Sequence, residues 1–293
     1  METKITFPDR LSLGSLYLAD RNFPHTRKWV GDAMGEFVSN TPASKMLGLA
    51  VSGHIRDDIL TEKLTGLQTF DSLDLSTARF SEQMLKTVSQ LNSLVELRLD
   101  FVPFTDYHIA QLEPLSSLST LWLLQTQITN KGLRNLLGLK ALKHLVLKNT
   151  DISDGGLTNL KDISTLQSLV LPKDITDKGL EELKECKSLT YLDLSFTKIS
   201  DVGMPHLGAL TELQTLYLSD TAISDHGVAH LKNLSKLHTL FLSGTSVSDA
   251  CLATIEQLPA LGFIEMRDSR VTVKGVNALR ANKPNLEIIG PDF

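Results

Sequence analysis

Three histidines come closest, by residue type and spacing, to forming a chemical site. His226 and His230 are four residues apart in a segment predicted to be helical, so they share one helix face. His206 holds the place of His230 in the preceding 24-residue segment, which would bring the imidazoles side by side. Imidazole binds transition metals, but His226 is not followed by the glutamate of an H-E-x-x-H motif. Three solvated side chains on a convex helix face explain the pattern more simply, and we assign no metal ligand and no cofactor.

Other catalytic patterns are missing from the sequence. It contains no G-x-x-x-x-G-K-[ST] loop, no G-x-S-x-G elbow and no cysteine pair with zinc spacing. Carboxylates such as Asp177, Asp201 and Asp225 recur in line, but a residue repeated in nearly every segment is better explained by helix starts than by catalysis. The sequence predicts a protein without enzymatic activity. A metal-binding or hydrolytic protein that uses the histidines is the alternative.

Leucines recur every 24 residues over most of the chain. Each anchor is followed after three residues by a second apolar side chain and after two more by a third, as in Leu118, Leu121 and Leu123. Alternation along a short strand sends the last two to the same face. A fixed period of this length indicates a stack of similar coils. The anchors are Leu94, Leu118, Leu142, Leu166, Leu189, Leu213, Leu237, Leu261 and Leu286.

A second signature, Ile-[Ser/Thr]-Asp-x-Gly-[Leu/Val/Met], follows the strand in most units, as in residues 199–204 and 223–228. The Ser or Thr is expected to cap a helix, and the Asp suits the positive end of the helix dipole. The recurrent Gly predicts a close approach of the backbone to the sheet at that point. Threonines such as Thr126 and Thr221 precede the signature, and we expect their hydroxyls to bond to the neighbouring coil.

These motifs resemble the leucine-rich repeat family, in a 24-residue bacterial-type variant with the pattern L-x-x-L-x-L-x-x-T-x-I-[ST]-D-x-G-L. The resemblance covers roughly residues 46–293. It implies an α/β solenoid with a curved parallel sheet on the concave face and helices on the convex face. It implies no particular activity. Strands are predicted near residues 48–51, 72–75, 96–99, 120–123, 144–147, 168–171, 191–194, 215–218, 239–242 and 263–266.

The segment of residues 1–45 lies outside the repeat. We interpret it as an N-terminal cap, because the end of a coil stack exposes an apolar edge. Strands are expected at residues 12–18 and 35–39, with a loop or short helix over residues 19–33. Residues 46–293 then form the repeat domain. The unit that begins at Leu166 is one residue short, and we expect a local irregularity there.

Charge and hydropathy favour a protein partner. The chain of 293 residues is 42% hydrophobic, carries a net charge of −5 and has no basic cluster. This composition argues against nucleic acid and against an anionic membrane surface. No apolar run is long enough to span a bilayer, and the first residues lack the apolar core of a signal peptide, so we expect a cytoplasmic location.

The outward-facing strand positions give the candidate partner surface. Aromatic residues are few in this sequence, yet several fall in these positions, where they would serve as anchors for a protein or peptide. Charged residues beside them would set orientation. The next outward column holds Phe101 and Phe196. A homo-oligomer that covers the same patch is also possible. The predicted partner-binding residues are Trp122, Leu124, Val146, Val170, Tyr191, Tyr217, Phe241 and Phe263, with Arg98, Glu96, Lys148, Asp193 and Glu265 as rim charges.

Overall fold

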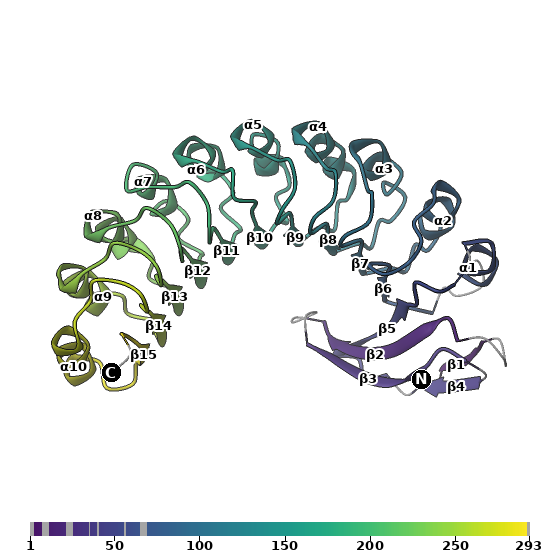
Figure 1. Cartoon of the computed structure of the whole chain (residues 1–293), viewed down its shortest axis with the longest axis horizontal. Coiled ribbons are helices and arrows are strands. Elements are labelled where there is room, and N and C mark those ends of the chain that lie inside the picture. Colours follow the sequence, from purple (N-terminus) through teal and green to yellow (C-terminus); the bar gives the residue numbers. More distant parts are fainter. Residues whose placement is uncertain are drawn as a thin grey trace. The chain divides into compact units, whose positions relative to one another are not determined.

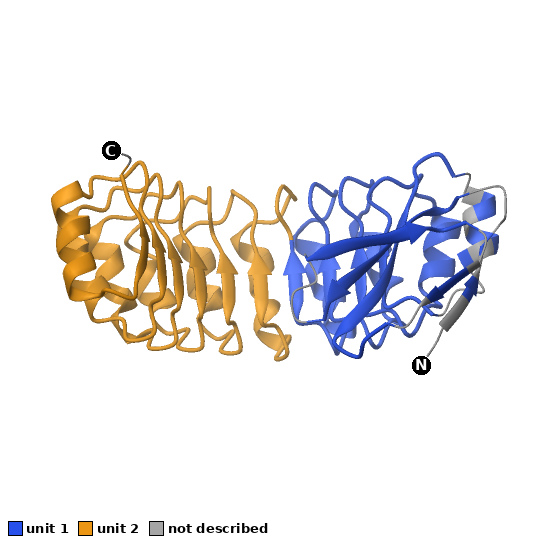
Figure 2. Ribbon diagram, turned by 90° about the horizontal axis from the view of Figure 1, so that it is seen from below, with its two compact units in different colours: residues 1–146 blue, residues 147–293 orange. Residues whose placement is uncertain are grey.

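The computed structural model describes residues 3–7, 12–21, 26–34, 36–39, 41–55, 57–64 and 69–291. The chain divides into two compact units, residues 1–146 and residues 147–293, shown in blue and orange in Figure 2. Within each unit, short strands lie on one side of a stack of coils and helices on the other (Figure 1). Among the described helices, none is both long enough and apolar enough to cross a bilayer.

The first unit combines antiparallel and parallel strands. β1 (Thr3–Thr6) and β4 (Glu36–Ser39) form a small antiparallel pair. β2 (Gly14–Asp20) pairs antiparallel with both β3 (Arg27–Asp32) and β5 (Lys45–Val51). From β5 onward the strands are parallel. The parallel strands are β6 (Ser72–Asp74), β7 (Glu96–Arg98), β8 (Thr120–Trp122) and β9 (His144–Val146); the helices are α1 (Asp57–Leu64), α2 (Glu82–Val88), α3 (Asp106–Ala110), α4 (Asn130–Leu133) and the 3-10 helix η1 (Arg134–Gly138).

The second unit is entirely a stack of strand–turn–helix coils. Its parallel strands are β10 (Ser168–Val170), β11 (Tyr191–Asp193), β12 (Thr215–Tyr217), β13 (Thr239–Phe241), β14 (Phe263–Glu265) and β15 (Glu287–Ile289). Its helices are α5 (Asp154–Leu157), α6 (Asp177–Leu183), α7 (Met204–Leu207), α8 (Asp225–Val228), α9 (Leu252–Glu256) and α10 (Val273–Asn282), with 3-10 helices η2 (Leu160–Asp162), η3 (Ala229–Asn233) and η4 (Asp249–Cys251).

The predicted strands and register are confirmed. Each predicted range contains or overlaps a parallel strand, and equivalent leucines pair across neighbours, as Leu192 does with Leu216 and Leu216 with Leu240. All three are completely buried. The short unit keeps this register, since Ser168 pairs directly with Tyr191. The missing residue is therefore absorbed by the turn after β10, not by the sheet.

Two expectations about local structure are wrong. The interpretation of residues 19–33 as a loop or short helix is replaced by β3, which completes an antiparallel ribbon with β2; residues 22–25 lie outside the described residues. The repeated threonines do not bond to the neighbouring coil. Thr126 Oγ1 donates to the carbonyl of Leu123 at 2.8 Å, within its own turn. The same bond recurs at Thr150, Thr197, Thr221 and Thr245, and at Ser269 in the equivalent place.

Repeated aspartates connect successive coils. In the second unit, Asp177 accepts hydrogen bonds from the amide of Ser200 at 2.8 Å, from its hydroxyl at 2.7 Å, and from the amide of Gly203 at 3.1 Å. Corresponding bonds join Asp106 to Thr129 in the first unit. The further pairs are Asp154–Thr176, Asp201–Ser224, Asp225–Ser248 and Asp249–Thr272. The carboxylates therefore bridge coils as well as beginning helices.

The recurrent glycines make room for these aspartates. A Cβ on Gly132 would lie 2.4 Å from Asp106 Oδ1, and one on Gly203 would lie 2.6 Å from Asp177 Oδ1. Both distances are shorter than van der Waals contact. The expectation that the backbone approaches the sheet at these glycines is wrong, because the close approach is between a helix and the carboxylate of the preceding coil.

Replacement of Leu216 by Ala is expected to lower the free energy of unfolding by about 2–5 kcal/mol, because it leaves a cavity between coils that cannot collapse fully. Urea unfolding followed by circular dichroism measures the change. Thr239→Ala, on the half-exposed strand face, is the matched control and should stay near wild type. Equal stability of wild type and Leu216→Ala would contradict the packing described here.

Gly132→Ala is expected to destabilise the protein, although alanine is the better helix former by about 0.5–1 kcal/mol. The reason is the contact with Asp106. Asp106→Ala alone should cost about 1.5–3 kcal/mol, the usual effect of losing hydrogen bonds to a charged group. In the double variant the cost of Gly132→Ala should fall or change sign, measured by a double-mutant cycle of unfolding free energies. Additive effects would show that the glycine serves another purpose.

Candidate functional site

The two cysteines are poor nucleophiles. Cys251 stands where other coils have the glycine, and it is buried against Asp225; burial, followed by the nearby carboxylates of Asp225 and Asp249, raises the pKa of its thiol to about 12. Burial and then Glu185 raise the pKa of the Cys186 thiol to about 11. Neither thiol is a thiolate at neutral pH, which is the form that reacts.

The histidines do not assemble a metal centre. In the part of the chain that the structure describes, no group of three or more His, Cys, Asp or Glu side chains is placed to hold a metal ion. His226 and His230 are exposed on α8 and η3, and His206 is half-buried on α7. The geometry therefore gives no support to the alternative of a metal-binding or hydrolytic protein.

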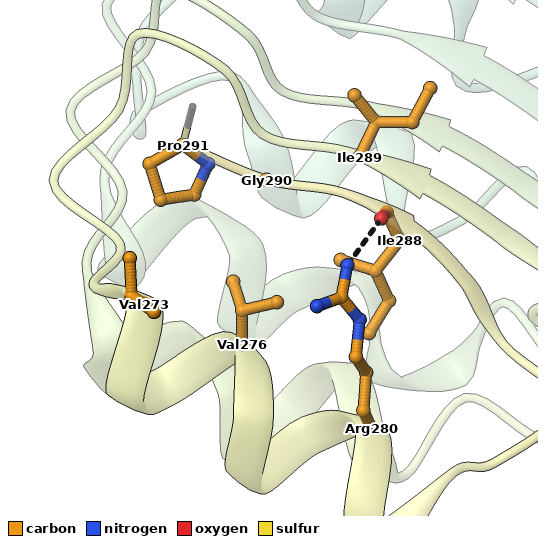
Figure 3. A pocket seen from close by; sticks show the side chains of 7 residues that line it. All are labelled: Val273, Val276, Arg280, Ile288, Ile289, Gly290 and Pro291. Atoms are coloured by element: carbon orange, nitrogen blue, oxygen red, sulfur yellow. Dashed lines mark hydrogen bonds between the residues drawn. The ribbon is translucent and has the colours of Figure 1, made fainter. Parts of the chain in front are cut away.

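A small hollow lies beside the last helix and strand. Val273, Val276, Arg280 and the segment of residues 288–291 line about 200 Å³ (Figure 3). That volume is below the usual range for a small-molecule site. The guanidinium of Arg280 donates a hydrogen bond to the backbone carbonyl of Ile288, on β15, at 3.2 Å.

The strand face of the first unit carries an internal polar network. The Glu96 side chain is completely buried; it accepts from the Ser72 hydroxyl and from Trp122 Nε1, the latter at 2.9 Å, and lies 3.4 Å from an Arg27 nitrogen. The Tyr17 hydroxyl is 2.6 Å from the Ser72 hydroxyl. Burial, then the charge of Glu96, raises the pKa of Tyr17.

Two arginines cover aromatic rings on this face. The Arg98 guanidinium lies 3.9 Å from the centre of the Trp122 ring, and its Nε is 3.6 Å from Asp100. The Arg27 guanidinium lies 4.3 Å from the centre of the Tyr17 ring and bonds to Asp74. Cations stack favourably on aromatic faces, so these rings are satisfied inside the molecule.

Glu96 is therefore not an exposed rim charge, and that expectation is corrected. Carboxylates are rarely buried without partners, and here the serine, tryptophan and arginine supply them. Sequence spacing placed Glu96 correctly on the strand face but could not show that residues from β3 and β6 cover it. The other residues predicted on this unit, Arg98, Trp122, Leu124 and Val146, are half-buried.

The strand face of the second unit is built from aromatic side chains. Tyr191 and Tyr217 have ring centres 5.4 Å apart, Tyr217 and Phe241 are stacked at 4.1 Å and 7°, and Phe241 and Phe263 are 5.3 Å apart. We call these four residues, on β11 to β14, the aromatic ladder. All four are half-buried, so each still presents surface to solvent. Burial, followed by Tyr217 and Asp193, raises the pKa of Tyr191.

Charged residues flank the ladder. Asp193 is in register with Tyr217 and Glu265 with Phe241, so a carboxylate stands on either side of the stacked pair. Lys148 Nζ lies 3.9 Å from Asp193, and Arg267 Nε lies 3.9 Å from Glu265. Val170, the remaining residue predicted on this unit, is half-buried on β10.

Phe196 belongs to the same surface, although the sequence analysis did not include it among the partner-binding residues. It is 57% exposed and has a φ of 67°, and Lys148 Nζ lies 5.3 Å from its ring centre. Bulky residues rarely adopt this left-handed conformation. The equivalent positions hold Gln125, Asn149, Asp220, Gly244 and Asp268, most of which tolerate it well, and Phe101, which is 58% exposed with a φ of 64°. The mismatch of residue type with position was the signal that could have found both phenylalanines.

The comparisons with known proteins agree with this architecture. The family model described as Leucine Rich repeat matches residues 185–204. Two Listeria monocytogenes internalins have similar structures. Internalin InlF superposes with a TM-score of 0.61 at 24% identity over 84% of this chain, and internalin C2 (InlC2) with a TM-score of 0.56 at 22% identity over 80%.

This chain spans 66% of the InlF chain and 92% of the InlC2 chain, and at these identities the likeness concerns the fold. No curated protein sequence gives a significant match. Three observations agree on the repeat fold: the 24-residue period of the sequence, the parallel strand–turn–helix coils of the structure, and the matches to the family model and to the internalin structures. The chain therefore has the leucine-rich repeat fold, and residues 185–204 match the model of that family.

Proposed function

We propose that the chain is a non-enzymatic module that binds a protein or peptide on the strand face of its second unit. The observation that carries this proposal is the aromatic ladder, Tyr191–Tyr217–Phe241–Phe263, which is stacked yet incompletely covered. Aromatic side chains dominate binding hot spots because they bury a large area at little cost in conformational entropy. A repeat fold serves such binding well, because its strands present one side chain per coil at a fixed spacing.

The strained backbone conformation of Phe196 also supports a binding role for this strand face. An exposed phenylalanine in a left-handed conformation stabilises neither the core nor the turn, and strain of this kind is characteristic of functional positions. The Phe196 ring lies beside the Lys148 ammonium, which also approaches Asp193, one of the two carboxylates that flank the aromatic ladder. Phe196 therefore extends the proposed surface from the strands to the turns that follow them.

Catalysis has no comparable support. The cysteine thiols have raised pKa values, and the described histidines form no ligand group. A homo-oligomer that covers the ladder with a second copy is the competing occupant. Sedimentation of the purified chain distinguishes a second copy from a different protein. If the wild type and the ladder variants are all monomers, no second copy covers the ladder, and the face is free to bind a different protein.

Tyr217→Ala combined with Phe241→Ala is expected to weaken partner binding by about 2–4 kcal/mol, as hot-spot truncation does. The partner is first identified by affinity capture from native lysate, then purified and titrated calorimetrically. His226→Ala with His230→Ala, on the helix side, is the control and should bind as wild type does. Loss of binding in the histidine variant, with retention in the ladder variant, would refute the proposed function.

Phe196→Asn is expected to raise stability and lower affinity at once. Asparagine accepts the left-handed conformation, so the free energy of unfolding should increase by about 1 kcal/mol, measured by urea unfolding. Binding to the purified partner should weaken because the exposed ring is gone. Phe196→Leu keeps the strain but removes the ring, so it should lower affinity without the gain in stability. A destabilised Phe196→Asn variant would show that the ring serves the fold.

A further inference from the structure

His108 holds the start of α3 through an unprotonated ring nitrogen. The backbone amide of Thr105, the residue before the helix, donates a hydrogen bond to His108 Nδ1 at 2.9 Å, and the Thr105 hydroxyl lies 3.0 Å from the same nitrogen. A glutamate or glutamine usually accepts this bond in a capping box. Because a backbone amide only donates, Nδ1 carries no proton, and the neutral ring has its proton on Nε2.

The equivalent amide and hydroxyl are bonded differently in later coils. There they donate to an aspartate of the preceding coil, as those of Thr129 do to Asp106 at 2.8 and 2.6 Å. The coil before Thr105 has Glu82 in the place of that aspartate, and Thr105 bonds to His108 instead. His108 therefore takes over the role of the aspartate at the first link of the row.

His108 also stands where later coils have the recurrent small residue. Glycine is required where an aspartate of the preceding coil occupies the space of a Cβ, as Asp106 does opposite Gly132. At the first link that aspartate is missing, so a larger side chain fits and turns back toward Thr105. The equivalent positions hold Gly132, Gly156, Gly179, Gly203, Gly227, Cys251 and Gly275.

Three aromatic rings pack around the imidazole. Its centre lies 5.0 Å from that of the Phe80 ring, 5.4 Å from that of Phe104 and 5.6 Å from that of Tyr107. Burial disfavours the charged imidazolium and lowers the pKa of His108, and the carboxylate of Glu82 opposes this shift as the smaller effect. The surroundings thus favour the neutral ring that the bond from Thr105 requires.

The charged groups on the elements beside α3 act on this ring only weakly. They are Arg79 before α2, Glu82 and Lys86 on α2, Lys131 on α4 and Arg134 on η1, and all five are exposed. Of these, Glu82 acts on the imidazole. Within α3, the carboxylate of Asp106 is bonded to Thr129. Solvent and salt screen exposed charges, so they stabilise a protonated ring only slightly.

The helical turn that His108 caps also connects its coil to the next one. α3 has only five residues, and Asp106, the first of them, accepts the two bonds from Thr129. Asn135 Nδ2, on η1, donates to the backbone carbonyl of Asp106 at 3.3 Å. Helices this short are not stable by themselves, so they depend on caps and packing. Loss of the cap therefore loosens Asp106 and its bonds to the next coil.

We propose that His108 is an acid-sensitive fastening in the first unit: protonation of its ring at mildly acidic pH releases the Thr105 amide and loosens α3. The Thr105 hydroxyl can turn to accept a bond from the protonated ring. The Thr105 amide cannot, and it is left facing a second N–H group. The contact between this coil and the next then depends on packing alone at the Asp106 turn.

The pH range follows from the direction of the pKa shift. Because the pKa of His108 is lowered in the folded chain, the fastening is complete above the ordinary histidine value of about 6.5 and is lost as the pH falls through the lower folded value. The ordinary pKa of aspartate is about 3.9, so the links made by aspartates persist in that range. The link at Thr105 is therefore the first of the row to open on acidification.

This inference goes beyond the proposed function and does not depend on it. His108 lies on α3 of the first unit, whereas the aromatic ladder lies on β11 to β14 of the second. Partner binding by the ladder variants bears on the proposed function, and the behaviour of the Thr105 amide bears on the fastening.

Nuclear magnetic resonance of the full wild-type chain tests the fastening without any substitution. At neutral pH, nitrogen-labelled histidine should show Nδ1 of His108 unprotonated. On acidification the ring should titrate below about pH 6.5, and the Thr105 amide signal should shift with the same midpoint. Amide exchange, corrected for its intrinsic pH dependence, should show the protection of Thr105 falling about fivefold, the usual effect of losing a helix cap. The amide of Ser200, which bonds to Asp177, should keep its protection.

His108→Gln separates the proton from the cap. Glutamine accepts the same bond but does not titrate, so the protection of Thr105 in this variant should not change over the same pH range. His226→Gln is the matched control, because His226 is exposed in the first turn of α8; this variant should show the wild-type fall. A Thr105 amide that ignores the His108 titration, or the same fall in His108→Gln as in wild type, would overturn the inference. If His108→Gln does not fold, the wild-type titration decides alone.

Discussion

Stacking of coils through buried leucines and shared aspartates is the constraint on which the rest of the structure depends. Leucines such as Leu192, Leu216 and Leu240 pack each coil against the next. In addition, an aspartate of one coil accepts hydrogen bonds from the backbone amide and the hydroxyl of a Ser or Thr in the next coil, as Asp177 does from Ser200. The recurrent glycine of the next coil packs against this carboxylate, which leaves no room for a Cβ at that position. These contacts lie in the interior and on the helix side, so they leave the residue type at the outward strand positions free to differ from coil to coil.

The two units use that freedom differently. In the first unit, residues of the antiparallel β2–β3 ribbon reach the strand face, where Arg27 meets Asp74 and Glu96 and the Tyr17 hydroxyl meets Ser72. Its polar groups are thereby paired internally. In the second unit, the aromatic ladder and its flanking carboxylates have no comparable cover among the described residues. The same repeat therefore builds a closed polar network in one unit and an open aromatic surface in the other.

The sequence alone predicts the parallel strands almost to the residue, because a 24-residue period leaves one consistent register. It also places Tyr191, Tyr217, Phe241 and Phe263 on the outward side, since alternation along a strand is fixed. What it misses depends on contacts between distant segments. The burial of Glu96 follows from Ser72, Trp122 and Arg27, and the role of the glycines follows from an aspartate one coil earlier. The strand β3 lies outside the repeat, where no period guides the prediction.

The central claim is that the partner contacts the strand face of the second unit. Site-specific photo-crosslinking tests it most directly, with benzoylphenylalanine introduced either at Thr215 on β12 or at Lys232 on η3, positions on the strand and helix sides of neighbouring coils. Irradiation with the purified partner should give a covalent adduct from Thr215 and none from Lys232. An adduct from Lys232, with none from Thr215, would contradict the account.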